Sequence, residues 1–235
     1  MLNSEKILAI ITARGGSKGI LHKNIKLLNG KPLISYTIES ALKSKLIDEV
    51  IVSTDDDKIS EISKQYGATV PFKRPKIFAK DSSSSESVII HTLNWLETKN
   101  QKFFDLFILL QPTSPLRTYK HIDNALKCFN RNKLANTLYS VVEVKQIPYK
   151  MKQINKNGFL LDFIPKQKVI KRRQDSPKLY YPNGAIYISK IDIFKKLKGF
   201  DESALFPFIM NEHDSIDIDS ELDFFFAESL LRKIN

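Results

Sequence analysis

The stretch Lys6-Ile-Leu-Ala-Ile-Ile-Thr-Ala13 decides the fold, because it is apolar almost throughout and ends at the basic loop Arg14-Gly-Gly-Ser-Lys18-Gly. An apolar run of this length, closed by a glycine-rich breaker, is typical of a strand buried on both faces of a parallel sheet. Residues 49–54 and 105–111 are two further runs of this kind, and segments with helical spacing separate them. Strands that alternate with helices predict an α/β sheet with right-handed crossovers.

The composition bounds the class of protein. The 235 residues are 42% hydrophobic, which suits one sizeable core, and the formal net charge of +11 favours anionic partners. Cys128 is the only cysteine, so no intramolecular disulfide can form and a reducing compartment is expected. The first apolar run is too short to span a membrane and lacks a signal-peptide cleavage site, so we expect a cytoplasmic protein without a membrane partner.

Residues 145–178 interrupt the alternation of strands and helices. They contain ten Lys or Arg against two Asp, and Asn155-Lys-Asn-Gly158 within them is a hairpin-turn signal. We therefore predict a single domain over residues 1–235, with a basic β-rich arm inserted at 145–178. Residues 184–189 are expected to return to the sheet as a core strand, and a last helix is expected over residues 220–231.

The basic loop after the first strand has the features of an anion-binding site. Two adjacent glycines expose backbone N–H groups, and Arg14, Lys18 and Lys23 add three cations within ten residues. The spacing differs from the Walker A motif and from Gly-x-Gly-x-x-Gly, so a P-loop kinase and a dinucleotide dehydrogenase both fit poorly. The alternative is a glycine turn with solvated lysines, but the position directly after a buried first strand favours a phosphate site.

Two other segments carry candidate site residues. Asp217-Ile218-Asp219 alternates strictly, and as a strand it would point both carboxylates to one face, where Mg²⁺ would relieve their repulsion. The alternative is an exposed strand with polar outer positions. Gln111 ends a buried run at the edge where α/β sheets bind ligands, and its amide offers both a donor and an acceptor. The alternative is a polar residue that caps a turn.

Together these segments resemble the acylneuraminate cytidylyltransferases, also called CMP-sialic acid synthetases. The motifs that carry the resemblance follow in family order along nearly the whole chain: Ala13-Arg-Gly-Gly-Ser-Lys-Gly19 with Lys23-Asn24, Gly30-Lys-Pro-Leu-Ile34, Val52-Ser-Thr-Asp55, Arg74-Pro75 with Ala79-Lys-Asp81, Leu110-Gln-Pro-Thr-Ser-Pro-Leu-Arg117, Asn183-Gly-Ala-Ile-Tyr187 and Ile216-Asp-Ile-Asp219. The related KDO enzymes typically carry Gln-Gly-Asp-Glu-Pro where this chain has Gln-Pro-Thr-Ser-Pro.

The resemblance implies a three-layer, Rossmann-like nucleotidyltransferase fold with a mostly parallel sheet. It implies transfer of CMP from CTP to the anomeric hydroxyl of a nine-carbon 2-keto sugar acid, of the sialic or legionaminic type, with release of pyrophosphate. It also implies Mg²⁺ as cofactor and a homodimer in which the arm packs across a two-fold axis, beside the neighbouring subunit's sugar site. Another sugar acid, such as KDO or pseudaminic acid, is the alternative among enzymes. A basic nucleic-acid-binding protein is the alternative from another class.

The resemblance further assigns roles to single residues. For CTP it implies Ala13, Arg14, Lys18, Lys23, Asn24, Arg74, Ser85 and Gln111, with Gln111 reading the base. For the sugar acid it implies Gln111, Lys150, Arg173 and Asn183. The implied Mg²⁺ ligands are Asp217 and Asp219, and the residues implied to act in catalysis are Arg14, Lys18, Lys23 and Asp219.

Overall fold

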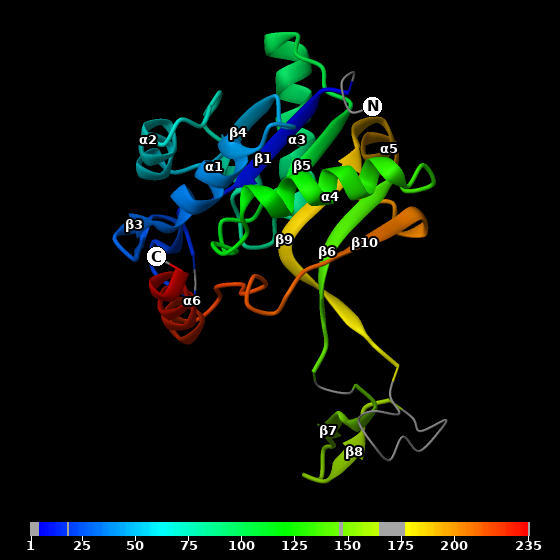
Figure 1. The fold of residues 1–235 in the computed structure, drawn as a ribbon. Helices are drawn as coiled ribbons and strands as arrows, with labels where there is room; N and C mark the ends of the chain where they lie inside the picture. The colour runs from blue at the N-terminus through cyan, green and yellow to red at the C-terminus, as the bar shows by residue number, and fades with distance from the viewer. Residues whose placement is uncertain (1–4, 18, 146–147, 165–176, 235) are drawn as a thin grey trace.

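A six-stranded sheet forms the centre of the computed structural model, which describes residues 5–17, 19–145, 148–164 and 177–234 (Figure 1). The strand order is β10-β6-β9-β5-β1-β4. The strands are β1 Ile7–Thr12, β4 Glu49–Ser53, β5 Leu106–Leu109, β6 Thr137–Glu143, β9 Tyr180–Lys190 and β10 Leu205–Ile209. Of these six, β9 alone runs antiparallel to its neighbours, β5 and β6. The predicted mostly parallel sheet is confirmed.

Helices cover both faces of the sheet, which gives three layers (Figure 1). One face carries α1 Leu33–Lys43, α2 Asp57–Gln65 and α4 Tyr119–Arg131, and the other carries α3 Ser85–Asn100 and α5 Ile191–Leu197. The C-terminal helix, α6 Glu221–Ile234, packs against the small hairpin of β2 Leu27–Leu28 and β3 Lys31–Pro32. Among the described residues, no helix combines the length and apolar character that crossing a membrane requires.

The strand β1 shows why an apolar run marks the centre of the sheet. Ile7 and Ile11 pack with α1, α2 and α4, whereas Leu8 and Ile10 pack with α3 and α5. All four side chains are at most 1% exposed. Since successive side chains of a strand point to opposite faces, a strand covered on both faces must be apolar at each position.

Two details differ from the sequence prediction. The prediction of a strand at residues 216–219 is wrong: the segment joins no strand, and Ile218 N–H donates instead to the carbonyl of Thr113 at 2.9 Å. Strand β10 was not predicted, because Pro207 interrupts its strand pattern. Proline is accepted there because β10 lies at the edge of the sheet, where one side needs no N–H donors.

The inserted arm contains the expected hairpin. β7 Lys152–Ile154 and β8 Leu160–Asp162 pair antiparallel and stand away from the central sheet (Figure 1). Asn155 closes the turn, because its Oδ1 accepts hydrogen bonds from the N–H groups of Asn157 and Phe159. Gly158 adopts a φ of +81° there, which a residue with a side chain would resist. The arm residues 165–176 lie outside the described part of the chain.

Arg117 ties three elements together from inside the protein. Its guanidinium is buried, and Nη1 donates to the carbonyls of Gln111 and Ala185, each at 3.1 Å. Nη2 donates to Thr37 Oγ1 at 2.6 Å. These acceptors belong to the loop after β5, to β9 and to α1. Burial lowers the pKa of Arg117 to about 9, so the group still carries its charge at neutral pH.

Arg117→Met should lower the free energy of unfolding by about 3 kcal/mol, because three buried acceptors lose their donor and each unpaired group costs about 1–3 kcal/mol. Urea unfolding followed by circular dichroism measures this loss. The matched control is Arg131→Met at the exposed end of α4, which should change the free energy by less than about 0.5 kcal/mol. An Arg117→Met variant as stable as the wild type would contradict the structural role given to this residue.

Candidate functional site

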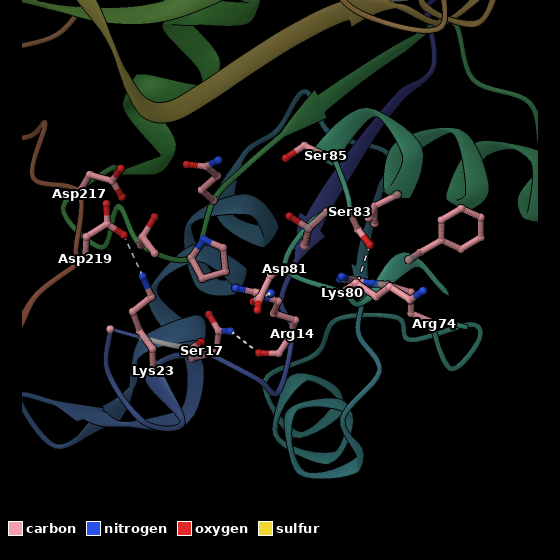
Figure 2. Close-up of a pocket in the computed structure, with 18 residues that line it drawn as sticks. Arg14, Ser17, Lys23, Arg74, Lys80, Asp81, Ser83, Ser85, Asp217 and Asp219 are labelled. Atoms are coloured by element: carbon pink, nitrogen blue, oxygen red, sulfur yellow. Dashed lines mark hydrogen bonds and ion pairs between the residues drawn. The ribbon is translucent and has the colours of Figure 1, made fainter. Parts of the chain in front are cut away.

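A cavity of about 520 Å³ opens beyond the carboxyl ends of β1 and β5, the edge at which α/β sheets bind ligands. Figure 2 shows how its labelled residues are distributed. In this view Asp217 and Asp219 lie at one end and Arg74 at the other, with Arg14 and Asp81 between them. The cavity is therefore elongated, and its two ends have different chemistry.

The loop after β1 contacts the segment that carries the two carboxylates. Asn24 is buried and its Nδ2 donates to the carbonyl of Arg14 at 3.0 Å, which fixes the start of the loop. A Cβ on Gly19 would collide with the carbonyl oxygen of Asp219, so this close approach requires glycine. The predicted anion loop and the predicted carboxylates therefore line one cavity, although they lie about two hundred residues apart.

Two cations of this loop are already paired with carboxylates. Arg14 Nη1 forms an ion pair with Asp81. Lys23 Nζ donates to the carbonyl of Ile218 at 2.7 Å and lies 3.1 Å from Asp219 Oδ1. The Lys23 side chain is half-buried between these groups, so it holds Asp219 against the loop and at the same time faces the cavity.

Asp217 and Asp219 differ in their surroundings. Asp217 Oδ1 is buried and has no hydrogen-bond partner among the described residues. Burial raises the pKa of Asp217, and a hydrogen bond from Thr113 acts in the opposite direction. The Asp219 side chain is 80% exposed. A buried carboxylate oxygen without a partner, beside a second carboxylate, is a position that a cation would satisfy.

The donor set in this end of the cavity suits Mg²⁺. Within the part of the chain that the structure describes, no three His, Cys, Asp or Glu side chains are grouped as a metal site. Mg²⁺ needs no such cage, because it commonly takes one or two carboxylates and fills its remaining positions with water and substrate phosphate oxygens. Asp217 and Asp219 supply that number of carboxylates.

Arg74 lies at the other end and is held by the backbone of the sheet. Its Nη2 donates to the carbonyls of Ser53 and Ala13, the latter at 3.2 Å, and its Nε donates to Ser53 Oγ at 3.1 Å. Burial lowers the pKa of Arg74 to about 10, and the neighbouring Asp55 opposes that shift. Ser85, the first residue of α3, also lines the cavity.

The side chains of Gln111 and Asp217 both lie against the backbone of Gly184. A Cβ on Gly184 would lie 2.8 Å from Gln111 Oε1 and 3.1 Å from Asp217 Oδ2, and the φ of this residue is +77°. Glycine is required here on both counts. The amide of Gln111 therefore lies close to Asp217, at the carboxylate end of the cavity. The two roles that the resemblance implies for Gln111, base reading and contact with the sugar acid, stay predictions.

Asn183 lies behind the site. It is 2% exposed, its Oδ1 accepts from Ser140 Oγ at 2.6 Å, and its Nδ2 donates to Ser215 Oγ at 2.8 Å. These bonds anchor the segment that leads to Asp217 onto β6 and β9. The structure thus gives Asn183 a supporting position, with its amide occupied by protein groups.

Two other predicted residues, Ala13 and Lys150, do not line the cavity. Ala13 is 2% exposed, and its carbonyl accepts the hydrogen bond from Arg74 Nη2. Lys150 is exposed at the base of the arm. Lys18 and Arg173 lie outside the described residues. Their roles stay predictions.

Several residues that line the cavity were not predicted: Thr12, Ser17, Phe78, Lys80, Asp81, Ser83, Val88, Pro112 and Thr113. Asp81 and Thr113 fall inside two of the motifs that carry the family resemblance, so order along the chain was the available signal for them. Phe78 carried no local signal, because an apolar residue in a loop has the same appearance whether it lines a ligand site or packs against a helix.

Comparisons with known proteins identify a family and relatives that match most of this chain. A family model described as Cytidylyltransferase matches residues 8–205. The CMP-N,N'-diacetyllegionaminic acid synthase of Legionella pneumophila subsp. pneumophila is 36% identical over 230 residues, which are 96% of this chain and 96% of that protein. The N-acylneuraminate cytidylyltransferase of Streptococcus agalactiae serotype V is 35% identical over 93% of this chain, but the chain spans only about half, 52%, of that relative.

A solved structure has a similar fold. It is described as CMP:2-keto-3-deoxy-manno-octonic acid synthetase complexed with CTP, and it superimposes with a TM-score of 0.72 over 98% of this chain and 100% of that chain. At 17% identity, this likeness concerns the fold alone. The family model spans most of the sequence, and the Legionella relative matches it nearly end to end. The chain belongs to the cytidylyltransferase family.

Proposed function

We propose that this protein transfers CMP from CTP to the anomeric hydroxyl of a nine-carbon 2-keto sugar acid and releases pyrophosphate. The observation that carries the proposal is the single cavity in which the cationic loop after β1 meets Asp217 and Asp219. By their names, the two curated relatives act on legionaminic and acylneuraminic acids, at 36% and 35% identity to this chain. We therefore propose the class of acceptor, acids of the sialic and legionaminic type.

In this proposal the triphosphate occupies the cationic part of the cavity. Arg14 offers a planar fork of donors that suits two phosphate oxygens, and phosphate would replace Asp81 as its partner. Lys23 adds a point charge on the same side. The anomeric hydroxyl attacks the α-phosphorus in line, and the charge that develops on the leaving pyrophosphate is neutralised by these cations.

We propose that Asp217 and Asp219 hold Mg²⁺. When bound, Mg²⁺ supplies positive charge that polarises phosphoryl oxygens. The protein prepares this position in two ways: Asp217 keeps an unpaired buried oxygen, and Lys23 fixes Asp219 through a hydrogen bond. Gln111, whose amide lies beside Asp217, would contact the sugar acid, and Arg173 and Lys150 of the arm are the proposed cations for its carboxylate.

We also propose that the protein is a homodimer joined in part through the arm. The hairpin exposes Ile154, Phe159 and Leu160 to 72%, 68% and 67% of their surface. Adjacent exposed apolar side chains on a projecting hairpin are typical of an interaction surface, and the commonest soluble oligomer is a symmetric dimer.

Pyrophosphate release should require CTP, Mg²⁺ and a sugar acid together, and a panel of N-acetylneuraminic and N,N'-diacetyllegionaminic acids tests this directly.

Asp219→Ala should lower kcat by about 100-fold or more. Removing a residue that only hydrogen-bonds to a metal ligand already costs about 10–100-fold in metal affinity or activity, and Asp219 is proposed as a ligand itself. Glu221→Gln, an exposed residue paired with Lys26, is the control and should keep wild-type activity. Wild-type activity in Asp219→Ala would show that the metal assignment is wrong.

Gln111→Ala distinguishes the two roles implied for that residue. We expect the KM for the sugar acid to rise about tenfold, because one hydrogen bond of about 1–1.5 kcal/mol is lost there. The preference for CTP over UTP should be unchanged, since the amide lies at the carboxylate end of the cavity. Competition between CTP and UTP in the pyrophosphate assay measures that preference, and its loss would restore the base-reading role.

Phe159→Glu should shift the protein from dimer to monomer, because a buried charge without a partner is costly in an apolar interface. Light scattering after size-exclusion chromatography measures the mass. Leu134→Glu changes a side chain that is 88% exposed in the loop between α4 and β6, and this control should remain dimeric. A wild-type monomer at working concentration would refute the dimer proposal.

A further inference from the structure

We propose that Phe78 determines the nucleotide specificity of this site, by forming the wall of the base-binding end and leaving room there for a pyrimidine but not for a purine. This inference rests on the proposed function. It concerns the end of the cavity marked by Arg74, away from Asp217 and Asp219.

The chemistry of the cavity assigns its ends. The triphosphate needs the cations near Arg14 and the two carboxylates, so the aromatic base is left to the other end. That end has apolar surface: the ring of Phe78, from η2 Lys76–Phe78, and the side chain of Val88, from α3, line the same cavity. A flat heterocycle is well accommodated by an aromatic wall with a few polar groups around it.

Phe78 separates the cavity from a second hollow. Behind it, on the outer side of α3, lies a space of about 430 Å³ that is lined by Phe78, Ser87, Ile90, His91, Asn94 and Trp95. Phe78 is the residue that both linings share. Its ring is thus a partition, and removing the ring would extend the first cavity into the second.

A row of rings in tilted and edge-to-face contact supports Phe78. The Phe78 and His91 ring centroids are 4.9 Å apart, and Phe72 meets His91 edge to face at 4.8 Å. Trp95 lies 5.1 Å from Phe72 and ends the row. Burial, and then the nearby charge of Arg74, lowers the pKa of His91. At neutral pH the ring behind Phe78 is therefore an uncharged one, in the neighbourhood of Arg74.

The loop that carries the ring is also fixed through its backbone. Phe78 N–H donates to the carbonyl of Pro75 at 2.9 Å. Ser83 Oγ donates to the carbonyl of Ile77 and accepts from the N–H of Lys80, each at 3.1 Å, and the second bond is drawn in Figure 2. The loop position is therefore set independently of the side chain of Phe78, so a variant can change the wall and keep the loop.

Phe78→Ala should widen specificity. In calorimetric titrations with Mg²⁺ present, we expect the Kd for CTP to rise about tenfold through lost stacking, and the Kd for ATP to fall by at least about tenfold. In the pyrophosphate assay the change with CTP should appear in KM, with kcat within about threefold, because the ring lies away from the reacting phosphate.

Two further variants distinguish the effect of the Phe78 ring in the cavity from the effect of the row of rings behind it. Phe78→Leu keeps most of the partition without an aromatic face, so it should weaken CTP binding and still exclude ATP. Phe72→Leu removes a ring of the same row that does not line the cavity, and it should leave both affinities within about threefold of wild type.

An unchanged ratio of CTP to ATP affinity in a folded Phe78→Ala variant overturns the inference, and thermal melting establishes that the variant is folded. If Phe78→Ala does not fold, Phe78→Leu decides the question: CTP binding no weaker than in Phe72→Leu overturns the stacking role. Failure of the proposed function has a different signature, since the wild-type protein itself would then neither bind CTP nor release pyrophosphate.

Discussion

One buried cation organises the edge of the sheet on which the site is built. Arg117 lies inside the protein, where its charge is shared among the carbonyls of Gln111 and Ala185 and the hydroxyl of Thr37. An isolated buried charge is costly unless oxygen atoms surround it, so these groups are held in one arrangement. Gln111 and Gly184, the neighbour of Ala185, therefore face each other with little freedom, and the carboxylate end of the cavity inherits that rigidity.

The opposite end of the cavity is built in another way. There the guanidinium of Arg74 is fixed by the carbonyls of Ser53 in β4 and of Ala13, the residue after β1, and a row of rings supports Phe78 from outside. The carboxylate end thus depends on close backbone approaches at glycine residues, and the Arg74 end depends on aromatic packing behind a loop. The loop after β1 lies between them and contacts the Asp219 segment at Gly19.

Much of this arrangement is predictable from the sequence, and the features that were not predicted have identifiable physical reasons. β1 and β5 are buried on both faces, so their continuous apolar runs predict them as central strands. The order of the family motifs predicts that Arg14 and Asp217 share one site, and both line the same cavity. β10 was missed because an edge strand needs no continuous apolar pattern and tolerates Pro207. The place of Gln111 within the cavity depends on Gly184, from a strand seventy-odd residues later, and no local pattern contains that information.

The ion pairs within the cavity have a consequence for how an anion would be attracted to it. Arg14 is engaged by Asp81 and Lys23 by Asp219, so an incoming phosphate exchanges partners with these cations and does not meet them as free charges. Added salt screens the ion pairs between these cations and the carboxylates as much as the ion pairs that the cations form with phosphate. Nucleotide affinity should therefore fall less steeply with ionic strength than the number of cations in the lining suggests, and selectivity should derive more from shape than from long-range attraction.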